Sequence, residues 1–138
     1  MKISIIGFGL IGSSIARAVM NSVGDGALVQ AIDSNPETLA TAKSLGICHE
    51  ASAQISNIHK GADFIVLATP VGASVELLRD IINIAGPSTI ITDVGSVKST
   101  LIDAAERVAP KFDRFVPAHP MAGSHLSGPE HGLSLIHI

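Results

Sequence analysis

The chain has 138 residues, of which 46% are hydrophobic, 15% are charged and one, Cys48, is a cysteine, and its formal net charge is −3. This length and composition indicate one folded domain, and the charge excludes a basic surface for nucleic acid. No apolar run is long enough for a signal peptide or a membrane span, and one cysteine excludes an intrachain disulfide and a cysteine-rich metal site. We therefore expect a cytoplasmic domain with no metal and with no nucleic-acid or membrane partner.

Taken in chain order, apolar runs alternate with segments of helical periodicity. Asn35 is expected to cap the second predicted helix, at 36–45, and Gly46 to end it. The core must be aliphatic, since aromatic residues make up only 3% of the chain, and such a core suits a parallel sheet covered on both faces. The pattern predicts an α/β fold with a doubly wound, mostly parallel sheet. Strands are expected at 2–6, 28–32, 47–50, 64–68, 89–92 and 114–117, and helices at 10–23, 36–45, 72–85 and 96–108.

The first strand ends in the glycine turn GFGLIG, residues 7–12, which is a complete G-x-G-x-x-G between a strand and a helix. Gly7 permits a tight turn, Gly9 lets the backbone approach a pyrophosphate, and Gly12 lets the helix pack on the strand. The helix N-terminus then offers free N–H groups and a partial positive charge to phosphates. We expect the whole turn to contact a dinucleotide: Gly7, Phe8, Gly9, Leu10, Ile11 and Gly12.

Asp33 closes the second predicted strand, 21 residues after Gly12. This spacing fits the acidic residue that binds the ribose hydroxyls of NAD, and a carboxylate there repels the additional phosphate of NADP. Residues 34–36 offer no arginine to accept that phosphate. The alternative is that Asp33 merely begins a turn before Asn35. Together with the glycine turn, Asp33 predicts a Rossmann-type dinucleotide-binding domain whose cofactor is NAD.

Two further turns are expected at the same edge of the sheet, because ligands of such sheets bind beyond the carboxyl ends of the strands. Thr69 and Pro70 would shape the pocket floor near the nicotinamide, although an ordinary strand exit explains them nearly as well. Ser96 could cap the next helix or bond a substrate oxygen at the mouth of the site. Lys98 opposes the helix dipole; a solvated lysine is the simpler interpretation, and a ligand contact is the alternative.

His119 follows the last predicted strand, and Pro120 restricts the backbone beside it. An imidazole at this edge can take a proton from an alcohol as a hydride leaves the same carbon. The competing interpretation is a structural histidine, which is the more frequent role of a lone one.

The segments GFGLIGSSIA, DVGSVKS and HPMAGSHLSGPE together resemble the NAD-dependent prephenate/arogenate dehydrogenase family, over residues 2 to about 132. The last two segments are the specific ones, since many oxidoreductases share the first. The resemblance implies that residues 1–132 form the family's N-terminal dinucleotide-binding domain. It also implies oxidative decarboxylation of prephenate or arogenate in tyrosine biosynthesis, with hydride transfer to NAD, by a full-length protein that is a homodimer.

The resemblance assigns roles to single residues. Gly7, Gly9 and Gly12 would bind the pyrophosphate and Asp33 the adenosine ribose. His119 would be the catalytic histidine that takes the proton of the ring hydroxyl, and Ser96 would help to hold both that hydroxyl and the histidine. Weaker substrate contacts are expected at Ser96, Lys98, Gly123, Ser124 and His125.

Two features depart from the family. Many relatives carry a glutamate at the position of His125, so this histidine either alters the substrate gate or is a solvated loop residue. Residues 133–138 are expected to be an atypical tail, and the family's helical dimerisation domain, with its substrate-binding arginines, to be absent. The alternatives are another NAD(P)-dependent dehydrogenase or reductase of the β-hydroxyacid type, which the HPMAG loop disfavours, and a non-catalytic NAD-binding module.

Overall fold

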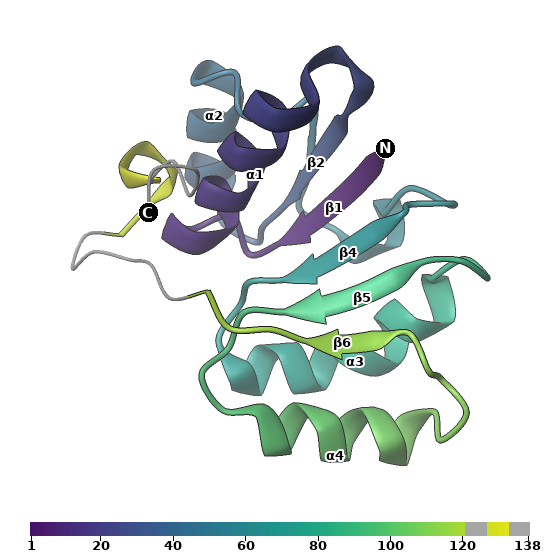
Figure 1. Ribbon diagram of the computed structural model, residues 1–138. Coiled ribbons are helices and arrows are strands. Elements are labelled where there is room, and N and C mark those ends of the chain that lie inside the picture. Colours follow the sequence, from purple (N-terminus) through teal and green to yellow (C-terminus); the bar gives the residue numbers. More distant parts are fainter. Residues whose placement is uncertain (121–126, 133–138) are drawn as a thin grey trace.

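The computed structural model describes residues 1–120 and 127–132, in which strands and helices alternate along the chain (Figure 1). The strands are β1 (Lys2–Ile6), β2 (Leu28–Ile32), β3 (Glu50–Ser52), β4 (Phe64–Leu67), β5 (Ile90–Asp93) and β6 (Phe115–Pro117). The helices are α1 (Leu10–Val23), α2 (Pro36–Ser44), α3 (Val71–Ile84) and α4 (Lys98–Val108). Short 3-10 turns are η1 (Gly24–Gly26), η2 (Ile55–Asn57) and η3 (Pro129–His131).

The strands form one sheet in the order β3-β2-β1-β4-β5-β6, and every neighbouring pair is parallel. Helices α1 and α2 cover one face, and α3 and α4 cover the other (Figure 1). The predicted doubly wound parallel sheet is therefore confirmed. The strand order reverses between β1 and β4, and this is where such sheets bind their ligands.

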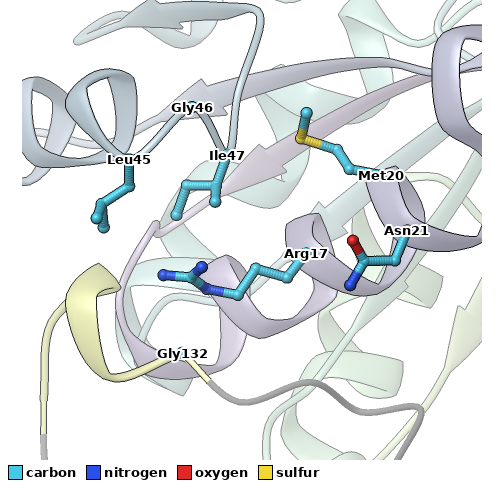
Figure 2. A pocket seen from close by; sticks show the side chains of 7 residues that line it. All are labelled: Arg17, Met20, Asn21, Leu45, Gly46, Ile47 and Gly132. Carbon is cyan, nitrogen blue, oxygen red and sulfur yellow. The ribbon is translucent and has the colours of Figure 1, made fainter.

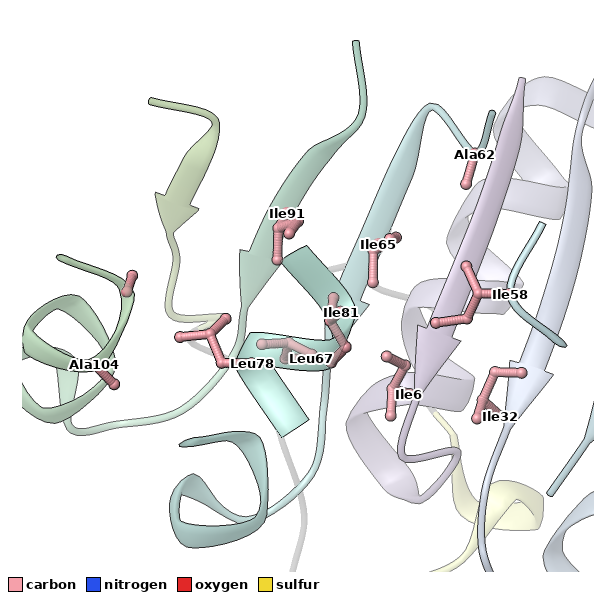
Figure 3. Close-up of a cluster of buried hydrophobic side chains, with 11 residues drawn as sticks. Ile6, Ile32, Ile58, Ala62, Ile65, Leu67, Leu78, Ile81, Ile91 and Ala104 are labelled. Atoms are coloured by element: carbon pink, nitrogen blue, oxygen red, sulfur yellow. The ribbon is translucent and has the colours of Figure 1, made fainter. Parts of the chain in front are cut away.

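The two faces of the sheet are both apolar, because side chains alternate along each strand. In β4, Ile65 and Leu67 belong to the cluster on the α3 and α4 side, together with Leu78 and Ile81 of α3 (Figure 3). Val66, between them, belongs to the cluster on the α1 and α2 side. Both clusters are built almost wholly from aliphatic side chains, as the composition predicts.

The hydrogen-bond ladder continues beyond the strand ends at the carboxyl edge. The Gly7 N–H donates to the Ile32 carbonyl (2.8 Å), and the Ala68 N–H donates to the Ile6 carbonyl (2.7 Å). The turns that follow β1, β2 and β4 are therefore fixed beside one another. The predicted site residues in these turns come together for this reason.

Two elements differ from the sequence prediction by two residues or more at one or both ends, whereas the other strands and helices agree with it to within one residue at each end. The third strand, expected at 47–50, is displaced to Glu50–Ser52, because Ile47 and Cys48 are core residues of the segment that leads into it. Helix α4 begins at Lys98 rather than Ser96, and its N-cap is Val97. Within the described residues, no helix is both long and apolar enough to span a membrane.

Candidate functional site

The glycine turn joins β1 to α1 at the centre of the carboxyl edge. Gly7 has a left-handed φ of +87°, and a Cβ atom there would lie 2.6 Å from the Ala68 carbonyl carbon. A Cβ atom on Gly12 would lie 2.1 Å from the Gly7 carbonyl oxygen. A Cβ atom on Gly9, by contrast, would meet nothing within 4 Å. Gly7 and Gly12 thus close the turn, and Gly9 faces open space above it.

The other residues of this turn divide between core and cleft. The Phe8 side chain is fully buried in the core cluster on the α1 and α2 side, so only its backbone is available to a ligand. Ile11 lines a cleft beside the turn. Leu10 begins α1, and its side chain is only partly buried.

Asp33 lies at the end of β2, and its carboxylate organises the neighbouring backbone. One oxygen, Oδ2, accepts a hydrogen bond from the Phe8 N–H (2.8 Å), and the other, Oδ1, accepts one from the Asn35 N–H (2.9 Å). Asp33 therefore links the glycine turn to the start of α2. Each oxygen of a carboxylate has a second lone pair, so the group can still accept hydrogen bonds from a diol.

Two clefts adjoin the glycine turn, and Thr69 lines both of them. The first, of about 210 Å³, has Gly7, Asp33 and Thr69 in its wall. Its remaining lining residues include Ser34, Ala53, Ile55, Ala73 and Leu77. None of these residues was predicted: Ser34 follows Asp33 in the chain, and the other four become its neighbours only when α3 and the segment that contains η2 pack beside the end of β2.

The second cleft, of about 380 Å³, lies between the ends of β4 and β5. Ile11, Thr69, Pro70 and Ser96 line it, and all four were predicted to be site residues. The Thr69 hydroxyl forms a hydrogen bond of 2.8 Å with the Ser74 hydroxyl, and Pro70 is the N-cap residue of α3. Both residues therefore have structural roles in addition to lining the cleft.

Ser96 and His119 meet at the rim of the second cleft. Ser96 Oγ and His119 Nε2 are 3.2 Å apart, which is hydrogen-bonding distance, and both residues are exposed. Ser96 lies in the turn after β5, and His119 lies just beyond β6, the neighbouring strand. Since its hydroxyl pairs with the imidazole and α4 starts later, Ser96 is not the helix cap that the sequence allowed.

Lys98 is partly exposed, but its amine is paired, and this corrects the simpler sequence interpretation of a solvated lysine. Its amine contacts the Asp93 carboxylate and the Ala118 carbonyl. Asp93, the last residue of β5, is fully buried and was not among the predicted site residues. The available signal was its position, since it ends a central strand just before the turn that carries Ser96.

Three of the predicted substrate contacts cannot be placed beside the other site residues. Gly123, Ser124 and His125 lie outside the described residues. Among the residues that are described, no group of three or more His, Cys, Asp or Glu side chains is arranged to hold a metal ion.

A further cleft, of about 460 Å³, lies on the outer side of α1, where the Arg17 side chain extends toward Leu45, Ile47 and Gly132 (Figure 2). It shares no lining residue with the two clefts at the glycine turn. Arg17 donates a hydrogen bond to the Pro129 carbonyl (3.1 Å), so this side chain anchors η3 on α1. We therefore place this cleft outside the candidate site.

The sequence and the fold both match known proteins. The sequence is 36% identical over 127 residues to the prephenate dehydrogenase of Bacillus subtilis (strain 168), a match that covers 91% of this chain and 34% of that protein. The structure superposes with a TM-score of 0.87 on prephenate dehydrogenase from A. aeolicus in complex with hydroxyphenyl propionate and NAD+. That match has 33% identity and covers 97% of this chain and 46% of the other.

A second solved structure, Synechocystis arogenate dehydrogenase, superposes with a TM-score of 0.84 at 28% identity and covers 96% of this chain and 45% of that one. The chain thus spans between about a third and a half of the length of these relatives. The family described as "Prephenate dehydrogenase, nucleotide-binding domain" matches residues 15–136. Because this match extends over most of the sequence, the chain belongs to the family of prephenate dehydrogenase nucleotide-binding domains.

Proposed function

We propose that this chain is the NAD-binding domain of a dehydrogenase that oxidatively decarboxylates prephenate or arogenate in tyrosine biosynthesis. The observation that carries the proposal is the Ser96–His119 pair at the rim of a cleft that begins at the glycine turn. The proposed enzyme acts on a small molecule in the cytoplasm, and its full-length form is a homodimer.

The turn and its neighbours fit NAD. The open space at Gly9 admits a pyrophosphate close to the backbone, and the N-terminus of α1 favours its negative charge. Asp33 lines the first cleft, where its carboxylate can accept hydrogen bonds from ribose hydroxyls. The same charge disfavours a phosphate on that ribose. The adenosine half would thus occupy the first cleft and the nicotinamide half the second.

The chemistry then divides between cofactor and protein. NAD, when bound, supplies the acceptor for the hydride that leaves the hydroxyl-bearing ring carbon of the substrate. His119 Nε2 takes the proton of that hydroxyl, which makes the carbon a better hydride donor. Ser96, within hydrogen-bonding distance of Nε2, holds the imidazole and the hydroxyl in line.

Loss of carbon dioxide completes the reaction. The electron pair of the bond to the ring carboxylate becomes part of the new aromatic ring, and the ring oxygen regains the proton held at Nε2. The product is 4-hydroxyphenylpyruvate from prephenate, or tyrosine from arogenate. Aromatisation supplies much of the driving force.

The first test is calorimetric titration of the 138-residue chain with NAD and, separately, with NADP. We expect NAD to bind at least about tenfold more tightly, because the Asp33 carboxylate repels the additional phosphate. Asp33→Asn should remove most of this preference, whereas Asp25→Asn, an equal change of charge at an exposed site in η1, should preserve it. Equal affinities in the unmodified chain would contradict the assignment of Asp33.

The second test addresses the proton acceptor and uses the complete product of the gene, assayed with prephenate and with arogenate. His119→Asn should lower kcat by about 10²–10⁴-fold, the range for loss of a general base. The dissociation constant for NAD should change by less than about twofold, because His119 is not among the residues that line the two clefts. Undiminished turnover in this variant would eliminate the proposed role of His119.

A further inference from the structure

We propose that Asp93 and Lys98 are positioning residues, which together hold His119 against Ser96. This inference rests on the proposed function, because it gives the two side chains a purpose in that reaction. It starts from the exposure of Ser96 and His119. Since neither side chain is fixed by burial, the distance between them depends on the backbone that carries each one.

Asp93 holds both of these backbone segments. Its Oδ2 atom accepts a hydrogen bond from the Gly95 N–H (2.9 Å), one residue before Ser96. Its Oδ1 atom accepts a longer one from the Ala118 N–H (3.4 Å), one residue before His119. One fully buried carboxylate thus connects the turn after β5 to the segment after β6.

Lys98 completes the connection from the other side. Its amine contacts Asp93 Oδ2 and also donates to the Ala118 carbonyl, which belongs to the peptide group that leads into His119. Both the N–H and the carbonyl of Ala118 are therefore held, one by each member of the pair. The amine also compensates the buried negative charge, which would otherwise carry a large desolvation cost.

The arrangement differs from an ion pair that only stabilises the fold. The three bonds from the pair to backbone groups each end within one residue of Ser96 or His119, so loss of the pair changes where these two side chains point. The proposal therefore predicts that the Ser96–His119 interaction exists only while Ala118 is held. Such a dependence can be measured as a coupling between substitutions.

The experiment measures the ring signals of the His119 imidazole by nitrogen-15 NMR of the 138-residue chain. These signals are assigned by their loss in His119→Asn. Ser96→Ala is made in four backgrounds: the unmodified chain, Lys98→Arg, Lys98→Met together with Asp93→Asn, and Lys111→Met. The double substitution removes the pair without leaving a buried charge unpaired, which would carry a large desolvation cost. Lys111 is exposed and lies before β6, so its replacement is the matched control.

In the unmodified chain, in Lys98→Arg and in Lys111→Met, Ser96→Ala should move the ring signals of His119. In the double-substituted background the same change should move them by less than about a fifth as much. An undiminished effect there would overturn the proposal, because the pair would then be irrelevant to the geometry. NAD titrations of the same proteins test the proposed function separately: failure to bind NAD would reject that function and leave the NMR result intact.

Discussion

At the scale of single residues, the contact between Gly12 and the Gly7 carbonyl sets how closely α1 approaches β1. A Cβ atom on Gly12 would lie 2.1 Å from that oxygen, which belongs to the backbone and cannot rotate away. Gly12→Ala should therefore lower the free energy of unfolding by about 2 kcal/mol or more, measured by urea denaturation. Gly72→Ala in α3, where a Cβ atom meets nothing within 4 Å, should be neutral or stabilising by up to about 1 kcal/mol. Equal effects of the two substitutions would show that the contact does not limit the packing.

At the scale of elements, the start of α2 depends on one side chain. The Asn35 side chain accepts a hydrogen bond from the Glu37 N–H (2.9 Å), and Pro36 occupies the first helical turn, as the sequence predicts. Asn35→Ala should cost about 1 kcal/mol of stability, measured by the shift of the urea midpoint at unchanged slope. Asn83→Ala, at an exposed position in the last turn of α3, is the control and should cost nothing, because alanine has the higher helix propensity. A loss at Asn83 as large as that at Asn35 would mean that the loss at Asn35 does not come from the cap.

The elements also show what the sequence predicts and where it stops. β1, α1 and β2 were predicted with the bounds that the structure has, because their apolar periodicity is bounded by glycine or by Asp33. The third strand was misplaced because Ile47 and Cys48 are apolar for a different reason: they fill the core before the ladder with β2 begins at Glu50. There the Val29 N–H donates to the ring of His49 (3.0 Å), a bond that no periodicity reveals.

The same limit applies to the candidate site. The glycine turn, Asp33, Ser96 and His119 could be found from sequence because each begins or lies within three residues of the end of a strand. The role of Asp93 could not, since its bonds reach Ala118, which is 25 residues away along the chain and adjacent only across β5 and β6. The correction at Lys98 has the same origin.

At the scale of the whole molecule, burial of Cys48 makes the free energy of unfolding depend on pH in the alkaline range. Burial raises the pKa of this thiol above its ordinary value of 9.0, against a smaller opposing effect of Lys43. The unfolded chain therefore releases this proton first, and the contribution of the thiol to stability should be fully present well below pH 9 and fall as the pH rises through 9 and above. Urea midpoints between pH 8 and pH 10.5 measure this fall, which should be smaller in Cys48→Ala. An identical fall in both proteins would assign it to other groups.

The wall that the two clefts share has a consequence for affinity. Thr69 lines both, so the two halves of a dinucleotide would lie in adjacent compartments on either side of one residue. A separate half-molecule loses its translational and rotational freedom in full when it binds. In a linked molecule, the first half that binds holds the second near its compartment at an effective concentration of about millimolar, so the second half binds more readily. AMP and nicotinamide mononucleotide offered as separate molecules should thus bind far more weakly than NAD, and neither should do much to recruit the other. With NAD bound as proposed, the fold would act as a bivalent receptor, and its avidity would reside in the pyrophosphate that links the two halves across Gly9.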